Sequence, residues 1–498
     1  MTPTKRLELP SIDGSPPMLV HLSAEYYPYA RTGGLAEAAW GLHRYQARRG
    51  LATAAILPLY RAVREHLHEM ELVGEPYTLD FGGRPETFRL WRDRDPASGT
   101  PSYFIQHDGF FDRAGIYGEG GRDYPDNHRR FAAFAAAAVA ALPRLTDGPI
   151  VLHAHDWHAS LAAVYLRRWY GGNPWFDRIP VVLSVHNGGY QGHFPAEVMP
   201  EIGLPWSLFT YEALEWYGKV NFLKGGLTHA DAATTVSPAH SRELRTAAGG
   251  FGLQEVYRAM GRRFTGVLNG IDLEEWNPRT DRYLAARYGP TDMAGKRACK
   301  ADLQQRCGLP ENPLVPVVAL AGRMVTQKGL DIVVRNHALF QFSAQFIFLG
   351  TGEPKYEVAI AGLQAAMPHR IGVQSRFSDE LEHVLMAGAD LLLMPSQYEP
   401  CGLTQMRAQH YGTIPVARRV GGLADTIDDG VSGFLFDAYE ERALGGGMWR
   451  ALTEMRAPRA WQEMQREAMA HDFGWDRAAE RYLELYTRAI IHRAGRTP

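Results

Sequence analysis

One segment in the last third of the chain combines residue types that suit a phosphorylated sugar. Residues 395–405 read PSQYEPCGLTQ and carry the carboxylate of Glu399. The segment follows an apolar run, 390–394, that predicts a buried parallel strand, and it leads into a helix predicted over 403–411. The backbone amides expected to open this helix are those of Gly402, Leu403 and Thr404. Amides at a helix start bind phosphate, and a nearby carboxylate accepts hydrogen bonds from sugar hydroxyls. The segment therefore suits a sugar attached to a diphosphate.

A glycine pair near the N-terminus is a second candidate for contact with a ligand. Residues 26–35 read YYPYARTGGL and lie between the first predicted strand, 18–23, and a helical pattern over 36–45. Gly33 and Gly34 allow the backbone to approach a ligand closely. Arg31 offers paired N–H donors for a phosphate or carboxylate. Taken alone, the pattern favours the alternative of a flexible turn with a solvated arginine.

Three histidines lie close together where another strand is predicted to end. Residues 153–158 read HAHDWH, with the strand predicted over 150–155 and a helix over 157–170. Asp156 is expected to be the helix N-cap. A zinc site would need further ligands from elsewhere in the chain. The sequence therefore favours a sugar-binding or structural cluster, and no metal is expected.

A further polar cluster follows the predicted strand 181–185. His186 stands directly after this strand, and the loop continues as NGGYQG through Tyr190 and Gln191. A single histidine is more often a satisfied core residue than a catalyst. Polar clusters at three strand ends of one parallel sheet nevertheless indicate a ligand site, because such sheets bind ligands at the carboxyl ends of their strands.

In the second half, two cations share one loop after a predicted strand. Residues 322–329 read GRMVTQKG, and Arg323 and Lys328 have no acidic residue between them. A diphosphate clamp is one interpretation, and ordinary solvated cations are the other. Two further features of the second half are candidates for nucleoside contact. The loop 349–353 allows close approach of its backbone, and Phe377 suits either stacking on a base or a place in the core.

Strand and helix patterns alternate along the whole chain, which predicts parallel sheets covered by helices on both faces. The remaining predicted strands are 52–57, 232–236, 315–321, 345–349, 371–375, 391–394 and 414–417. We expect an α/β fold with two doubly wound domains, facing each other across a deep cleft that holds the active site. The expected ranges are 1–265, 266–473 and a C-terminal helix, 474–498, that returns to the first domain.

Composition narrows the class of function. The 498 residues are 45% hydrophobic and carry a formal net charge of −2, so neither nucleic acid nor a membrane is an expected partner. We expect no signal peptide and no membrane span, and the apolar, alanine-rich run 131–142 is predicted to be a buried helix. The odd number of cysteines, 3, indicates reduced thiols and a cytoplasmic location.

Taken together, the motifs resemble those of bacterial-type glycogen and starch synthases, which are retaining glucosyltransferases with the GT-B fold of two Rossmann-like domains. The resemblance runs in family order through nearly the whole chain. The matching motifs are TGGL at 32–35, the cluster 153–158, VHN at 185–187 with YQG at 190–192, LNGID at 268–272, QKGLD at 327–331, 399–405 and 421–426.

The resemblance implies a role for each matching position. Arg323 and Lys328 would bind the donor diphosphate, and Glu399 would hold glucose hydroxyls beside the amides of Gly402, Leu403 and Thr404. His186 would lie at the reacting bond. The other implied contacts are Asn269 with glucose, Phe377 with adenine, Arg31, Gly33 and Gly34 with phosphates, and Asp156, Tyr190 and Gln191 with sugar or acceptor. The implied substrates are ADP-glucose and an α-1,4-glucan, with no metal or other cofactor.

One position departs from the family pattern, which usually has lysine where this chain has Arg31. Arginine keeps the charge but has a forked, bulkier head, so the change is not neutral. Two alternatives follow. The chain could be a related glucosyltransferase that uses UDP-glucose or a small-sugar acceptor, or a glucan-binding regulator without turnover.

Overall fold

The computed structural model describes residues 6–67, 69–94, 100–376 and 378–495. The chain divides into two compact units, which are described separately below. Unit 1 is Met1–Gly270 together with Trp475–Pro498, and unit 2 is Ile271–Gly474. The division between the first two ranges expected from the sequence, 265/266, falls slightly earlier, inside the last strand of unit 1.

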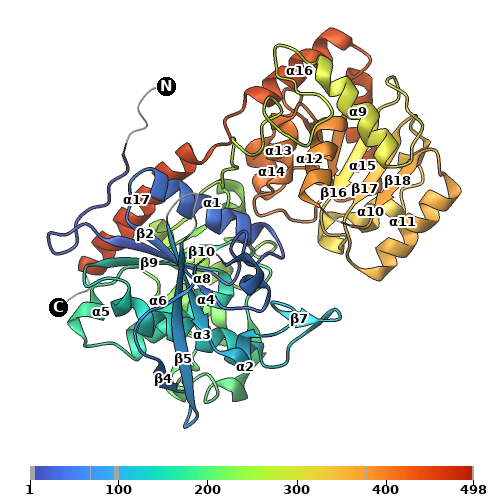
Figure 1. Ribbon diagram of the computed structural model, residues 1–498. Helices are drawn as coiled ribbons and strands as arrows, with labels where there is room; N and C mark the ends of the chain where they lie inside the picture. Colours follow the sequence, from blue (N-terminus) through green and yellow to red (C-terminus); the bar gives the residue numbers. More distant parts are fainter. Residues whose placement is uncertain (1–5, 68, 95–99, 377, 496–498) are drawn as a thin grey trace. The chain divides into compact units, whose positions relative to one another are not determined.

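Unit 1 is built on one large sheet with helices on both faces (Figure 1). Its strands, in spatial order, are β15 (Phe264–Gly266), β14 (Ala232–Thr235), β10 (Val181–Val185), β9 (Ile150–His155), β1 (Met18–Leu22), β2 (Thr53–Pro58), β6 (Pro101–Gln106), β5 (Pro85–Arg94) and β3 (Glu71–Leu72), with β4 (Tyr77–Asp80) paired to β5. The strands from β15 to β6 are parallel, and those from β6 to β3 are antiparallel. The antiparallel edge was not predicted from the sequence.

The helices of unit 1 include those predicted over 36–45, 131–142 and 157–170, with somewhat different ends, and others that were not predicted. They are α1 (Gly34–Arg48), α2 (Asp108–Phe111), α3 (Asn127–Ala141), α4 (Asp156–Arg168), α5 (Pro174–Asp177), α6 (Phe222–His229), α7 (Pro238–Glu243), α8 (Gln254–Ala259) and α17 (Trp475–Ala494). The unit also contains two small sheets. One pairs β7 (Gly118–Glu119) with β8 (Arg122–Asp123), and the other has the order β11 (His193–Pro195), β13 (Lys219–Asn221) and β12 (Glu215–Trp216). The alanine-rich helix α3 is almost wholly buried, as predicted.

The C-terminal helix α17 packs on the sheet of unit 1. Trp475, Tyr482 and Tyr486 share a buried cluster with Leu19 of β1 and Val151 of β9. A Cβ atom on Gly41 of α1 would lie 2.7 Å from the Trp475 ring, so only glycine fits there. The last helix therefore contributes to the core of the unit that begins the chain.

Unit 2 contains a parallel sheet in the order β18 (Ile371–Gln374), β17 (Gln345–Leu349), β16 (Val317–Ala321), β19 (Leu391–Met394), β20 (Ile414–Arg418) and β21 (Phe434–Phe436). Its helices are α9 (Ala294–Arg306), α10 (Leu330–Val334), α11 (Pro354–Ala366), α12 (Asp379–Gly388), α13 (Thr404–His410), α14 (Gly421–Thr426), α15 (Glu441–Glu454) and α16 (Pro458–Ala470). This order reverses at β16 and β19, the point where doubly wound sheets bind ligands.

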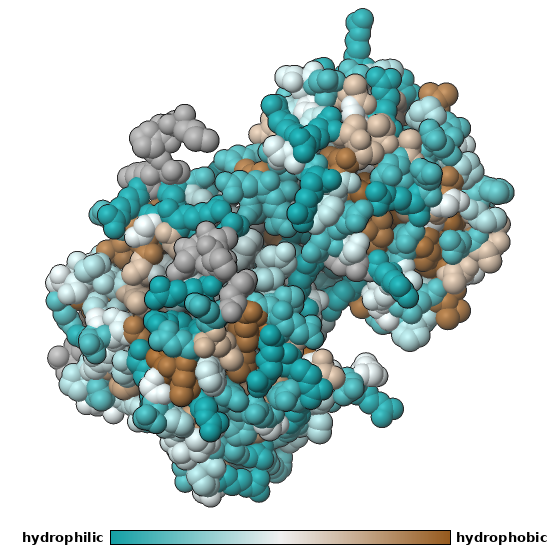
Figure 2. Space-filling model, in the orientation of Figure 1, coloured by the Kyte–Doolittle hydropathy of each residue, from teal (hydrophilic) through white to brown (hydrophobic). Residues whose placement is uncertain are grey.

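Surface hydropathy is mixed. On the face shown in Figure 2, hydrophobic residues form separate patches among hydrophilic ones. Among the described residues, each helix is too short or too polar to cross a membrane.

Candidate active-site residues

The central contact of unit 2 is an ion pair between the loops that follow β16 and β19. The Nζ atom of Lys328 lies 2.6 Å from Oε2 of Glu399, which also accepts a hydrogen bond from the Ser396 hydroxyl at 3.1 Å. Glu399 is buried, with 5% of its surface exposed, whereas 26% of the Lys328 side chain is exposed. The two residues that the sequence placed in a diphosphate clamp and a sugar contact thus lie side by side.

The two loops are held together by their backbones. The amide of Gln397 donates to the carbonyl of Gln327 at 2.8 Å. Gly329 has a left-handed φ of +77°, and a Cβ atom there would lie 2.1 Å from the carbonyl oxygen of Pro395. Any larger residue would push the loops apart. The glycine after Lys328 therefore sets the approach of the lysine to Glu399.

Arg323 begins the same loop at the end of β16. Its side chain is exposed and lies at the limit of a hydrogen bond, 3.5 Å, from Oε1 of Gln327. Gln327 in turn donates to the carbonyl of Tyr398 at 3.3 Å. The loop therefore carries one cation paired with Glu399 and a second cation exposed to solvent.

The backbone N–H groups shortly after Glu399 are free to donate hydrogen bonds to a ligand. In the described part of the chain, the N–H groups of Gly402, Leu403 and Thr404 make no hydrogen bond. Helix α13 begins at Thr404, one residue later than predicted, because Gly402 is left-handed with φ +72°. The helix has only 7 residues, so its dipole is weaker than expected for the predicted length.

In unit 1, the glycine loop is bound to a carboxylate that sequence reasoning missed. Glu25 is buried and accepts hydrogen bonds from the Thr32 amide at 2.7 Å and the Gly33 amide at 3.1 Å. Its other oxygen accepts from the hydroxyls of Thr32 and Tyr117, both at 2.6 Å. The Thr32 and Gly33 amides, in the loop expected to contact phosphate, are thus already hydrogen-bonded to Glu25. The position of Glu25, an acidic residue eight positions before the glycine pair, was the only hint of this contact in the sequence.

Helix α1 begins at Gly34, two residues earlier than predicted, and Gly33 is its N-cap. Arg31 lies beside the first turn of this helix, where its Nη2 atom is 3.3 Å from Oε1 of Glu37. About a quarter of the arginine side chain, 27%, is exposed. Arg31 is therefore directed along the start of α1 and keeps access to solvent.

Asp156 is the first residue of α4 and was wrongly expected to be its N-cap; His155 has that position. Its φ of +57° is unusual for a residue with a side chain and marks local strain. Asp156 Oδ1 instead accepts the backbone N–H of His186 at 2.7 Å. Burial raises the pKa of Asp156 to about 7, against the opposing effect of hydrogen bonds from His186 and Asn187.

His186 follows β10 and joins a buried histidine cluster. Its Nε2 atom lies 2.9 Å from Nδ1 of His155 on β9, and burial lowers the pKa of His186 to about 3. His21 on β1 was missed by sequence reasoning, although a histidine in an otherwise apolar strand was a signal. It lies in register with His153 of β9, while the pairing of β9 with β10 brings His155 and His186 together.

The remaining predicted residues have different surroundings. Tyr190 is half exposed at 52%, so its ring is accessible. Gln191 is buried: its amide donates to the carbonyls of Gly188 and Phe251 and accepts from Asn221. These contacts favour a structural role for Gln191. Asn269 is buried near the end of unit 1, and Phe377 lies outside the described residues.

The buried histidines make stability depend on pH. Among the described residues, burial lowers the pKa below 6.5 for nine histidine rings, and the six most deeply buried are His21, His43, His153, His155, His158 and His186. Below pH 6.5 the unfolded chain takes up protons that the folded chain does not, so the folded state loses stability. Asp156 has the opposite sign, since its raised pKa favours folding as pH falls from about 7. The protonation of Asp156 therefore offsets the loss of stability caused by only one histidine ring.

We therefore expect the free energy of unfolding to fall between pH 6.5 and 5, by about 1.4 kcal/mol per pH unit for each uncompensated ring. Urea titrations at several pH values measure this. Asp156→Asn removes the opposing group and is expected to steepen the loss. Stability that stays constant or rises on acidification to pH 5 would contradict the prediction.

Comparisons with known proteins identify the family of the chain. Residues 19–259 match the family model of the starch synthase catalytic domain, and residues 304–468 match that of glycosyl transferases group 1. The chain is 45% identical over 475 residues to a glycogen synthase of Anaeromyxobacter sp. (strain Fw109-5), covering 94% of this chain and 98% of the relative. It is 40% identical to the glycogen synthase of Syntrophotalea carbinolica, covering 95% and 99% of the two chains.

A solved structure extends the likeness to the fold. The catalytic domain of starch synthase IV from Arabidopsis thaliana, bound to ADP and acarbose, is 31% identical and superposes with a TM-score of 0.86. The match covers 96% of this chain and all of that one (100%). The motifs predicted from the sequence, the two parallel-sheet units and these relatives agree. The chain belongs to the glycogen and starch synthase family of glycosyltransferases and has the GT-B fold.

Proposed function

We propose that this synthase transfers glucose from ADP-glucose to the 4-hydroxyl at the non-reducing end of an α-1,4-glucan, with retention of the anomeric configuration. The observation that carries the proposal is the contact between Lys328 and Glu399, 2.6 Å apart at the switch point of the unit 2 sheet. One cation for a diphosphate and one buried carboxylate for sugar hydroxyls are the two recognition elements that a nucleotide sugar requires. ADP in the related plant structure supports the choice of nucleotide.

The chemistry follows from charge. When the bond between glucose and phosphate breaks, the sugar ring gains positive character and the departing diphosphate gains negative charge. Lys328, Arg323 and the free amides after Glu399 are suited to stabilise that diphosphate. The acceptor hydroxyl then attacks the same face of the sugar and gives its proton to the leaving phosphate. The reaction as proposed requires no metal.

On unit 1, we assign the sugar contacts to His186, Asp156 and Tyr190. The accessible Tyr190 ring suits stacking on a sugar of the acceptor, because aromatic faces cover the apolar face of a sugar ring. Three buried cysteines without disulfides, Cys299, Cys307 and Cys401, support a cytoplasmic location.

Nucleotide release from a panel of donors tests the proposal. Incubation with glycogen is expected to release ADP from ADP-glucose faster than UDP or GDP from the other glucose donors. Faster release from UDP-glucose would replace the donor assignment, and the Arg31→Lys variant would then show whether Arg31 sets that preference. Transfer to small sugars but not to maltooligosaccharides would replace the acceptor assignment. No release from any donor would leave a glucan-binding regulator as the better account.

A further inference from the structure

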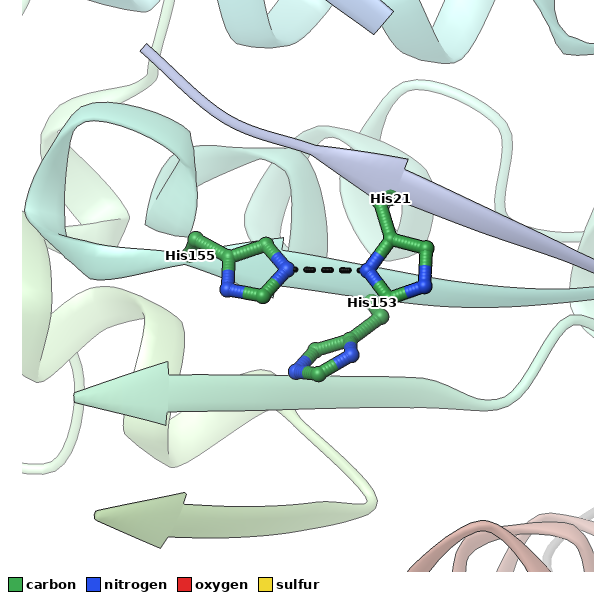
Figure 3. Close-up of side chains that lie close together, drawn as sticks. All are labelled: His21, His153 and His155. Carbon is green, nitrogen blue, oxygen red and sulfur yellow. Dashed lines mark hydrogen bonds between the residues drawn. The ribbon is translucent and has the colours of Figure 1, made fainter. Parts of the chain in front are cut away.

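Three buried side chains of unit 1, Gln46, His21 and His155, form an unbroken hydrogen-bonded row that ends at the partly buried His186. Gln46 Oε1, on α1, lies 2.8 Å from Nε2 of His21 on β1. The Nδ1 atom of His21 lies 3.0 Å from Nε2 of His155 on β9, the contact drawn in Figure 3. The Nδ1 atom of His155 then lies 2.9 Å from Nε2 of His186. Two neighbouring strands, β1 and β9, thus connect α1 to the end of β10.

The rings of this row are neutral. Burial lowers the pKa of His21 to about 4 and that of His155 well below 6.5. A neutral imidazole has one nitrogen that donates and one that accepts. In a row of such rings, the tautomer of each ring is therefore set by the hydrogen bond to its neighbour. The residue at the end of the row, by donating or accepting, sets the tautomers of all the rings.

Gln46 is the residue at the end of the row whose hydrogen-bonding role is fixed. Its Nε2 donates to the hydroxyl of Tyr486 on α17 at 3.1 Å, which leaves Oε1 to accept from His21. His21 must then carry its proton on Nε2, and the same follows for His155 and for His186. The other nitrogen of His186, Nδ1, keeps its lone pair, and it makes no hydrogen bond within the part of the chain that the structure describes.

We propose that Gln46 is a positioning residue for the transfer reaction. Acting through His21 and His155, it holds His186 in the Nε2–H tautomer, so that Nδ1 meets a sugar hydroxyl only as an acceptor. The identity of the sugar rests on the proposed function, whereas the tautomer does not. His186 is thereby set to receive a hydrogen bond from the substrate and to give none.

A metal site is the competing use of the same rings. The ligand atoms of His21, His153 and His155 lie within 4.8 Å of one another. Each ring nitrogen, however, already has a partner: His153 lies between the hydroxyls of Tyr486, at 2.9 Å, and Ser184, at 2.7 Å. Zinc would need a lone pair from each ring, and the nitrogens of His21 and His155 instead share a proton. The geometry therefore favours the hydrogen-bonded row.

Long-range nitrogen NMR of the full chain, labelled with 15N-histidine, tests the proposal without substrate. The expected result is a proton on Nε2 of His21, His155 and His186, with signals assigned from single histidine variants. A proton on Nδ1 of His186, an equal mixture of tautomers, or stoichiometric zinc in the purified protein would each overturn it. Because this spectrum comes from the unaltered protein, a variant that fails to fold leaves the test intact.

Gln46→Leu removes the fixed end of the row. The His186 signals are expected to become a mixture of tautomers, and kcat to fall about tenfold, the scale of one buried hydrogen bond, with a smaller change in KM. Ser184→Ala is the matched control, because it removes a buried hydrogen bond to His153 outside the row. It is expected to keep both the tautomer and kcat. A Gln46→Leu protein with an unchanged tautomer would refute the positioning role, whereas absence of nucleotide release in the unaltered protein would refute only the proposed function.

Discussion

Replacing Lys328 by alanine is expected to lower kcat by about 10²- to 10³-fold, the cost of removing one group that stabilises charge developing in the transition state. The Lys328 ammonium is the cation held closest to the buried Glu399, and it keeps access to solvent on its other side. Charge on the departing diphosphate grows as the glycosidic bond breaks, so the lysine contributes more to the transition state than to donor binding. The KM for the donor is therefore expected to change less than kcat.

Arg335→Ala is the control for this variant. Arg335 directly follows α10, as its C-cap residue, and makes an exposed ion pair with Asp331 at 3.4 Å. Its loss removes a cation of the same unit without touching Glu399, and exposed pairs contribute little. Steady-state nucleotide release measures both variants. A Lys328→Ala rate within threefold of the unaltered enzyme would remove Lys328 from the proposed clamp.

Replacing Glu399 by glutamine is expected to lower kcat/KM by about 10²-fold. The amide keeps the shape of the side chain but accepts weaker hydrogen bonds from sugar hydroxyls than a carboxylate does. It also loses the ion pair with Lys328, so the lysine is no longer held at 2.6 Å. Both the sugar contact and the position of the cation are therefore affected.

A double variant tests whether the two residues act together. If Lys328 and Glu399 form one unit, the combined loss of activity will be smaller than the product of the single losses. Glu463→Gln on α16, which removes an exposed ion pair with Arg466, is the matched control and is expected to be neutral. Fully multiplicative effects would show that the pair seen in the structure has no part in turnover.

The α/β architecture was predictable because strands buried on both faces read as short apolar runs. Strands β9, β10, β17 and β19 have the predicted ends. Strands β3, β4 and β5 were missed, since many of their residues are exposed and their pattern is mixed: β5 combines buried and exposed residues with charged ones. Strand β6 was also missed, although its middle residues are buried. Short edge strands such as β21, with 3 residues, carry too little pattern to be recognised.

The candidate site was predictable in its residue types and less so in its contacts. Polar residues at strand ends marked Glu399, Lys328 and His186, because the strands of a parallel sheet end at one edge. Pairing over long sequence separations left no local signal: Tyr117 donates to Glu25, the carboxylate that binds the glycine loop, and Gln46 reaches His186 through two other strands. Gly188 shows the same limit. In the sequence it is one of two adjacent glycines in the loop NGGYQG, with nothing to indicate a close neighbour, yet a Cβ atom there would lie 2.5 Å from the Leu244 side chain.

The most direct test of the central claim follows the sugar itself. The enzyme is incubated with ADP-glucose labelled in the glucose carbons and with glycogen, and the glucan product is analysed by NMR. The proposed function predicts label in new α-1,4-linked residues at the non-reducing ends, with one ADP released for each. Label that stays in free glucose, enters β-linked products or never reaches the glucan would contradict it.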